Sequence, residues 1–323
     1  PRRDRPARGR GPADGEDAPH HWQGQQVDRL LDDASPAALQ GLLVARRGAR
    51  IVGAAWAQVH PGSTATVWPA WLAADESEST AVELMTRVEG LLTESKVAIA
   101  QALTEQPTGT VVERLAMAGL VHATDLVYLA AERALQPLEP PRSNLACRPC
   151  SREGRGELQA VVERTYLGSL DCPNVHGARS LDDVVLGYES IGVDTPDRWL
   201  LIERVTSGER GASGEQGATS AAEPRRPAGE PVGCLILADH PHFDQLEIVY
   251  MGVLPEQRGR GVGKEICQWA LWHARQARRA QLVVAADAQN QPAVSMYLSA
   301  GFKIWERRCV FLRLLPSAPR DGL

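Results

Sequence analysis

An apolar run that ends in a glycine-rich turn constrains this chain more than any other stretch. Residues 246–254 are apolar and β-prone and are followed by Pro255, so they are predicted to form a buried strand. Basic residues and glycines alternate after this strand, in the order Arg258, Gly259, Arg260, Gly261, Val262, Gly263 and Lys264. From Ile266 to Ala274, apolar side chains recur at helical spacing. The predicted order is therefore strand, turn and helix.

This order predicts an anion site. Glycines allow consecutive N–H groups to converge on one point, and a helix N-terminus adds about half a positive charge there. The arginines and the lysine of the turn bring formal charge to the same place, so the natural ligand is a pyrophosphate. A Walker-type loop is excluded because no Gly-Lys-Ser/Thr follows the required spacer, and the Gly-x-Gly-x-Gly spacing fits a Rossmann fingerprint poorly.

Two motifs in sequence order resemble those of the GNAT acetyltransferases. Val253-x-Pro-x-x-Arg258-Gly-x-Gly-x-Gly263 is similar to motif A, whose backbone amides hold the pyrophosphate of acetyl-CoA. Asn290-x-x-Ala293-x-x-x-Tyr297-x-x-x-Gly301-Phe302 is similar to the second signature of the family. The resemblance implies a mixed α/β sheet with acetyl-CoA as co-substrate and no metal. The cofactor-binding residues that it implies are Met251, Gly252, Val253, Arg258, Gly259, Arg260, Gly261, Val262, Gly263, Lys264, Asn290 and Ala293.

Two residues are candidates for the proton transfers of acetylation. An alkylamine is protonated at pH 7, so a base must help it attack the thioester. Glu247, a charge on an otherwise apolar strand, stands where the resemblance places the base in several GNAT enzymes; a solvent-facing strand carboxylate is the alternative. The resemblance implies that Tyr297 protonates the departing thiolate; a core tyrosine at helical spacing is the alternative.

Two further residues are candidates for acceptor binding. The loop Tyr166-Leu-Gly-Ser-Leu-Asp171-Cys172-Pro173 is polar and constrained, and the corresponding loop of the family covers the acceptor site. Asp171 is predicted to hold an ammonium group there, and Tyr166 to line the pocket. Capping within the loop is an equally good interpretation.

The first half of the chain repeats the element order of the second. Its predicted strands are 42–45, 50–59, 64–72, 97–103 and 126–130, and its predicted helices are 80–92 and 110–118. Gly119 matches Gly301, which gives an offset of 301 − 119 = 182. The same offset puts Leu84 on Ile266, core face on core face. We interpret this repeat as a tandem duplication.

The first copy lacks the residues that define the anion site. With the offset of 182, the turn residues 258–261 and 263 correspond to Glu76, Ser77, Glu78, Ser79 and Ala81. Loss of the glycines restricts positive φ, and the carboxylates would repel a pyrophosphate. Tyr297 corresponds to Leu115, and Glu247 to Ala65. The first copy is therefore predicted to be non-catalytic.

The length of 323 residues favours two domains of ~150 residues. The predicted organisation is a disordered tail (1–21), a degenerate GNAT-like domain (22–134), a proline-rich linker (135–150) and a catalytic GNAT domain (151–316) with a disordered insertion (206–230). Residues 302–315 are predicted to close the fold as a pair of strands. The tandem arrangement is similar to that of mycothiol synthase and its relatives.

Composition excludes several classes of partner. A net charge of −5 gives no global attraction to nucleic acid or to anionic membranes, and no apolar run approaches the ~18 residues that would span a bilayer. No signal peptide opens the chain, and six cysteines in this length are no disulfide scaffold, so a cytoplasmic setting is expected. Cys147, Cys150, Cys172 and His176 have the residue types of a zinc site, but with one tight pair they predict none; whether they come together stays open.

These features predict an acetyl-CoA-dependent N-acetyltransferase that acetylates a primary amine of a small molecule by direct attack in a ternary complex. Acetylation of a protein or peptide amine is one alternative. A non-catalytic acyl-CoA-binding interaction module is another. The identity of the acceptor, the length of the acyl group and the oligomeric state are left open.

Overall fold

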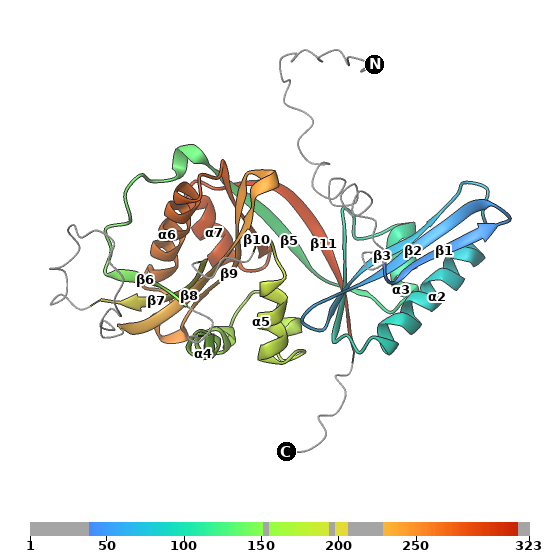
Figure 1. Cartoon of the computed structure of the whole chain (residues 1–323), viewed down its shortest axis with the longest axis horizontal. Helices are drawn as coiled ribbons and strands as arrows, with labels where there is room; N and C mark the ends of the chain where they lie inside the picture. Colours follow the sequence, from blue (N-terminus) through green and yellow to red (C-terminus); the bar gives the residue numbers. More distant parts are fainter. Residues whose placement is uncertain (1–38, 151–154, 194–197, 206–228, 316–323) are drawn as a thin grey trace, which may run out of the picture. The chain divides into compact units, whose positions relative to one another are not determined.

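The computed structural model describes residues 39–150, 155–193, 198–205 and 229–315 (Figure 1). Contacts divide the chain into residues 1–40 and 41–323, and the second unit is described by itself. The predicted tail 1–21 lies outside the described residues, as does nearly all of the predicted insertion 206–230. No described helix combines the length and the apolar character that crossing a membrane requires.

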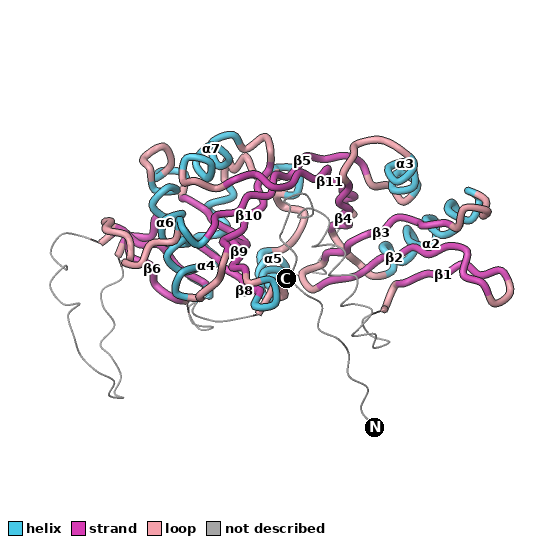
Figure 2. Tube along the Cα trace, turned by 90° about the horizontal axis from the view of Figure 1, so that it is seen from above, coloured by secondary structure: helices cyan, strands magenta, loops and turns pink. Residues whose placement is uncertain are grey.

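The described strands form one mixed sheet, with an 11-strand order that mixes the two halves of the chain (Figure 2). From edge to edge the order is β1 (Leu42–Arg47), β2 (Arg50–His60), β3 (Thr64–Leu72), β4 (Ile99–Thr104), β11 (Lys303–Leu314), β5 (Val121–Glu132), β10 (Gln281–Asp287), β9 (Gln245–Val253), β8 (Glu230–His240), β7 (Trp199–Arg204) and β6 (Leu145–Pro149). The α-helices are α2 (Glu78–Glu94), α3 (Thr110–Met117), α4 (Arg155–Tyr166), α5 (Leu181–Glu189), α6 (Val262–Gln276) and α7 (Gln291–Ser299). We call β1–β5 with α2 and α3 the first half, and β6–β11 with α4–α7 the second half.

The two halves exchange their last strands. The series β1 to β5 of the first half has the element order of β7 to β11, yet β4 pairs with β11 and β10 pairs with β5. Between β5 and β11, Leu126 lies opposite Arg308, and 308 − 126 = 182. These two facing residues at the centre of the β5–β11 pair are therefore separated by the same 182 positions as corresponding residues of the two halves. A local twofold axis through this pair relates the two series.

Helices cover the strands of the second half on both faces. Helices α6 and α7 pack on one face, in a core that includes Leu246, Ile248 and Leu282. Helices α4 and α5 pack on the other face, in a core that includes Cys234 and Ile236. This burial on both faces explains why β7 and β8 are continuous apolar runs.

The first half keeps the packing between helix and sheet that the second half has. A Cβ atom on Gly233 of β8 would lie 3.3 Å from the Ile266 side chain of α6, and one on Gly53 of β2 would lie 3.2 Å from the Leu84 side chain of α2. Both glycines let a helix approach the sheet closely. The match of Leu84 to Ile266, predicted from the sequence, is present in the packing.

Three details differ from the sequence-based expectations. Residues 303–314 form the single strand β11 and not a strand pair, because β4 and β5 of the first half supply its two neighbours. The proline-rich segment 135–150 contains strand β6, which pairs with β7 at the edge of the sheet. The counterpart of Glu247 is Thr66 and not Ala65. Glu247 pairs with Ala238 of β8, and Thr66 pairs with Gln58, which holds the corresponding position in β2.

Candidate active site

A cavity of about 600 Å³ opens where β9 and β10 separate. The two strands pair in parallel from Gln245 and Gln281 as far as Ile248 and Val284. Beyond these residues both strands line the cavity, together with the turn before α6, the first turns of α7 and the loop after α4. The backbone of residues 249–253 therefore has an edge without a neighbouring strand, where the amide groups of a linear ligand can pair.

The turn before α6 has the geometry of an anion site. Gly259 and Gly261 have φ angles of 72° and 81°, which favour glycine over residues with a side chain. A Cβ atom on either glycine would meet no atom within 4 Å, so the backbone is open on that side. Gly261 is the N-cap of α6 and provides no side-chain hydrogen bond to the helix. The N–H groups of Val262 and Gly263 are thus available to a ligand, whereas that of Lys264 donates to Gly261 O at 3.0 Å.

Most of the predicted cofactor residues line this one cavity. The lining includes Met251, Gly252, Val253, Arg258, Gly259, Gly261, Val262, Gly263, Lys264, Asn290 and Ala293. Arg260, the remaining predicted cofactor residue, is exposed and is not part of the lining. Of the other predicted site residues, Tyr297 and Asp171 line the cavity, whereas Glu247 and Tyr166 do not.

The guanidinium of Arg258 points away from an anion and binds main-chain carbonyl groups. Its Nη2 donates to the carbonyl oxygen of Thr165 at 2.7 Å, and its Nη1 donates to those of Leu167 and Gly168 at 2.8 and 3.1 Å. Nε donates to Val253 O at 3.1 Å. These acceptors lie at the C-terminal end of α4 and at the end of β9. Arg258 therefore ties the loop after α4 to the glycine turn.

Helix α7 brings Tyr297 to the cavity. Asn290 is the N-cap of this helix, and its side chain accepts a hydrogen bond from the Ala293 N–H. Tyr297 is buried in the core beneath α6, in contact with Phe302. Burial, with the nearby Cys267 and Asp171, raises the pKa of Tyr297 well above its usual value of 10.0. Its hydroxyl thus stays protonated at neutral pH and can donate a proton.

Glu247 forms a close pair with His240. His240 Nε2 lies 2.7 Å from Glu247 Oε2, across the tight connection between β8 and β9. Alternation along β9 puts the Glu247 side chain on the side of Val249, which packs with α4 and α5. Glu247 itself does not line the cavity, but Ile248 and Val249, the next two residues of β9, do.

The loop after α4 is held by two carboxylates. Asp171 Oδ1 accepts the Asp287 N–H at 3.1 Å, and Asp287 accepts the Cys172 N–H at 3.1 Å and the Thr124 hydroxyl at 2.8 Å. Thr124 belongs to β5, so a strand of the first half helps to fix the loop. Burial first, and then the charge of Asp287, raises the pKa of Asp171. A cation bound beside Asp171 would relieve this cost.

Tyrosine side chains lie behind this loop. The Tyr166 hydroxyl is 2.8 Å from that of Tyr188, and the Tyr250 hydroxyl is 2.7 Å from Thr165 Oγ1. Tyr166 stacks on His176 and contacts the edge of Tyr250. Tyr166 thus supports the loop from the core side, whereas Tyr250 lines the cavity.

The cysteines of the sequence motif are not a metal site. Cys147 packs with the α6 core and Cys150 with the α4 core, so they face opposite sides of the sheet. Burial raises the pKa of Cys172 to about 12, so this thiol is protonated and a poor nucleophile. Among the described residues, the group that meets the geometry of a metal site is elsewhere and does not contain these cysteines.

In the first half, side chains occupy the position of the cavity. Arg114 Nη1 donates to the carbonyl oxygen of Ala70 on β3 at 2.6 Å, and Arg114 also pairs with Glu78. Ser77 is the N-cap of α2, and its hydroxyl accepts the Ser79 N–H. This helix N-terminus is therefore satisfied by the chain itself and carries an acidic residue in its first turn.

Comparisons with known proteins identify the second half. Residues 192–302 match the family model Acetyltransferase (GNAT) family, so this part of the chain is similar to a GNAT acetyltransferase domain. Mycothiol acetyltransferase of Thermobifida fusca (strain YX) is 31% identical over 86 residues, which are 27% of this chain and 23% of that protein. The chain thus matches about a quarter of the length of this curated relative.

Solved structures show the same fold over most of the chain. A GCN5-related N-acetyltransferase from Sphaerobacter thermophilus aligns with a TM-score of 0.58 and 15% identity, over 90% of this chain and 85% of that one. A tandem GNAT protein from the clavulanic acid biosynthesis pathway aligns with a TM-score of 0.50 and 13% identity, over 92% and 95% of the two chains. At these identities the likeness concerns the fold.

Sequence reasoning missed His240 and Asp287. The spacing of 247 − 240 = 7 between His240 and Glu247, across a short connection, allows a cross-strand contact. Asp287 ends β10 and is 1% exposed. A charge directly after an apolar strand was the available signal, but its partners Thr124 and Cys172 lie far away in sequence.

Proposed function

We propose that the chain is an acetyl-CoA-dependent N-acetyltransferase that acetylates a primary amine of a small molecule in a ternary complex. The observation that carries this proposal is a single cavity that runs from an uncapped helix N-terminus, at Gly261, to Tyr297 and Asp171. An anion-binding backbone at one end and ionisable side chains at the other are the two requirements of acyl transfer from a diphosphate carrier.

The cofactor fits the residues that are present. The N–H groups of 259–263 hold the pyrophosphate, and Lys264 adds a charge beside it. The unpaired edge of β9 at 249–253 pairs with the amides of the pantetheine arm. The thioester then reaches the region between Tyr250 and Tyr297.

The reaction is a direct transfer. The amine nitrogen attacks the thioester carbonyl carbon, a C–N bond forms, and the C–S bond breaks. Glu247 accepts the proton that the amine loses, through one water molecule, and His240 keeps its carboxylate in place. Tyr297 donates a proton to the departing thiolate, and the second proton that the nitrogen loses once the C–N bond has formed restores the Tyr297 hydroxyl. Asp171 holds the ammonium form of the acceptor before it loses its proton.

We further propose that the chain is a tandem pair of GNAT-like domains of which the first is degenerate, and that it works in the cytoplasm. The repeated element order and the offset of 182 across the β5–β11 pair support the duplication. The contacts of Arg114 and Ser77 support the loss of cofactor binding in the first half. The free state of all six cysteines supports a reducing compartment.

The test is a coupled binding and turnover measurement on the purified full chain. Acetyl-CoA binding is followed by calorimetry, and thiol release is followed with a panel of small amines, including amino sugars and amino acids, and with lysine peptides. The proposal predicts acetyl-CoA binding and amine-dependent thiol release that is larger for small amines. Binding without turnover on the whole panel contradicts the enzymatic proposal, and preference for peptides contradicts the substrate class.

A further inference from the structure

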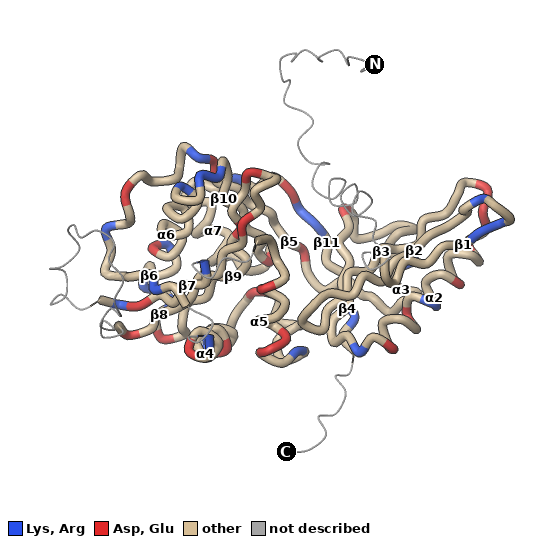
Figure 3. The backbone as a smooth tube through the Cα atoms, viewed as in Figure 1, with Lys and Arg blue, Asp and Glu red and all other residues tan. Residues whose placement is uncertain are grey.

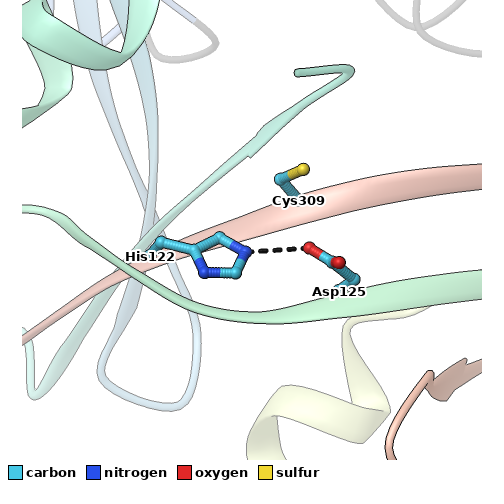
Figure 4. A group of neighbouring side chains, drawn as sticks. All are labelled: His122, Asp125 and Cys309. Atoms are coloured by element: carbon cyan, nitrogen blue, oxygen red, sulfur yellow. Dashed lines mark hydrogen bonds and ion pairs between the residues drawn. The ribbon is translucent and has the colours of Figure 1, made fainter. Parts of the chain in front are cut away.

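A second group of chemically active side chains lies on the central strand pair, outside the cavity. His122 and Asp125 of β5 and Cys309 of β11 each offer one ligand atom, and these atoms all lie within 4.8 Å of one another (Figure 4). His122 Nε2 is 2.8 Å from Asp125 Oδ1. We propose that these three side chains bind a divalent cation of the zinc class, with water as the fourth ligand.

A β-bulge creates the group. Residues 122 and 125 are three positions apart and would face opposite sides of a regular strand. The register shifts here, because Thr124 pairs with Val310 while His122 pairs with Phe311. The extra residue, Ala123, turns His122 to the side of Asp125. Asp125 lies directly opposite Cys309, so all three donors share one face.

The donors suit zinc in type and in spacing. Imidazole and thiolate ligands select zinc-like ions over Mg²⁺ and Ca²⁺, and a carboxylate completes common zinc sets. A tetrahedral ion with bonds of about 2.0 to 2.3 Å separates its ligand atoms by roughly 3.5 Å. To bind such an ion, the 2.8 Å distance between His122 Nε2 and Asp125 Oδ1 needs to lengthen to roughly 3.5 Å.

The group is held in place and is open to solvent. Cys309 is 8% exposed, and the buried Phe311 ring supports the imidazole of His122 at 5.4 Å. The side chains of His122 and Asp125 are 43% and 50% exposed, which leaves a path for an ion and room for a water ligand. The site thus combines a rigid buried donor with two accessible ones.

A second β-bulge, at the corresponding position of β11, serves as an internal control. A second register shift lies at Trp305, between Ile304 and Glu306, and 305 − 123 = 182. The positions that correspond to the three donors hold Ile304, Arg307 and Val127. None of these side chains ligates zinc. The donors are therefore particular to one bulge and are no consequence of the duplicated fold.

A bound ion would join the two exchanged strands, because β5 supplies two ligands and β11 one. Since the ligands come together in the folded chain, binding raises the free energy of unfolding by linkage. The site lies apart from the acetyl-transfer proposal, and its test uses no acetyl-CoA.

The experiment is a Co²⁺ titration of the metal-stripped full chain, followed by displacement with Zn²⁺. The expected result is a saturable thiolate-to-cobalt charge-transfer band at one equivalent, with the visible bands of a four-coordinate ion. Zn²⁺ should abolish these bands and raise the melting temperature. Absence of the charge-transfer band in the wild type overturns the proposal.

Three variants locate the site. Cys309→Ser should remove the charge-transfer band, and His122→Gln should weaken Co²⁺ binding by at least about tenfold. Cys172→Ser, at a half-buried cysteine outside the group, is the matched control and should bind Co²⁺ as the wild type does. His122 is exposed, so its variant keeps the test valid if Cys309→Ser fails to fold. Unchanged binding by His122→Gln overturns the assignment.

Discussion

The two halves of the molecule differ at the N-terminus of one corresponding helix. Each has a helix that begins beside a parallel strand pair, α6 beside β9 and α2 beside β3. In the second half the helix N-terminus is uncapped and a cavity of about 600 Å³ opens there. In the first half Ser77 caps the helix, and Arg114 donates to the main chain of the neighbouring strand.

This difference separates the residues that maintain the fold from those that maintain the site. Arg114 corresponds to Met296, because 296 − 114 = 182, and the carbonyl of Ala70 that it contacts corresponds to that of Met251 in the cavity wall. In the first half a side chain thus takes the hydrogen bond that the proposal gives to the cofactor in the second half. The glycines that allow close helix packing, Gly53 and Gly233, are kept in both.

The candidate base shows the same pattern. His240 contacts Glu247 at 2.7 Å, and its counterpart His60 contacts Thr66 at 3.0 Å. The histidine is present in both halves, but only the second half offers it a carboxylate. Elsewhere, basic and acidic residues are interspersed over the described part of the chain (Figure 3). The local side chains therefore account for the difference between the halves better than a long-range field does.

The largest expected effect comes from making Glu247 uncharged. Glu247→Gln should reduce kcat by about a hundred- to ten-thousand-fold, because the amine then keeps its proton. Acetyl-CoA affinity should stay unchanged, because Glu247 does not line the cavity. Pre-steady-state thiol release together with calorimetry separates the two quantities. A variant with nearly wild-type kcat would remove Glu247 from the mechanism.

Grafting the first-half turn onto the second half should weaken cofactor binding. The double variant Arg260→Glu, Gly261→Ser copies Glu78 and Ser79. It forces a side chain onto a φ of 81° and places a carboxylate beside the pyrophosphate. Acetyl-CoA affinity should fall about a hundredfold, or about 2.7 kcal/mol. Measurement of the dissociation constant checks this, and an unchanged value would contradict the assignment of the turn.

Replacing His240 should affect catalysis, whereas replacing its first-half counterpart His60 should not. His240→Gln should lower kcat about tenfold and change the pH profile of kcat/KM, because the group that fixes Glu247 is lost. His60→Gln, the matched change in the first half, should leave both unaltered. Equal effects of the two variants would indicate that these histidines act through stability alone.

Removing the side chain that fills the first-half site should affect stability and not binding. Arg114→Ala should lower the free energy of unfolding by about 1 to 3 kcal/mol, because the Ala70 carbonyl loses a charged donor. No second acetyl-CoA site should appear, since Glu78 and Ser77 remain. Urea unfolding and binding stoichiometry are the measurements. Two sites in this variant would show that Arg114 alone blocks the first half.

The smallest expected effect is a pH-dependent change in stability. The pKa of Asp171 is raised by burial, so the folded chain holds its proton more tightly than the unfolded chain does. The wild type should therefore lose stability as pH rises through that pKa, whereas Asp171→Asn should not. The variant should melt higher at neutral pH, with no gain below the usual value of 3.8. A gain that persists at that acidic pH would assign the effect to packing.

The sequence predicted the turn and its surroundings well because their information is local. Glycine spacing predicted the open turn before α6, and alternation or helical periodicity predicted the adjacent strands and helix. Eleven of the twelve predicted cofactor residues line one cavity for the same reason.

What the sequence did not predict depends on partners distant in sequence. The alternation along β11 does not say whether its neighbour is β5 or a strand of a local hairpin, so the strand exchange was missed. Arg258 was predicted to bind the cofactor, but its guanidinium binds carbonyl groups of the loop after α4. An offset of 182 applied without gaps also misplaced the counterpart of Glu247 by one residue.

The most direct test of the central claim is calorimetric titration of the full chain with acetyl-CoA. The account predicts one binding site per chain in the wild type, with about a hundredfold lower affinity in the Arg260→Glu, Gly261→Ser variant. Two equivalent sites, or one site whose affinity is unchanged in this variant, would contradict the claim that the second half alone holds the cofactor.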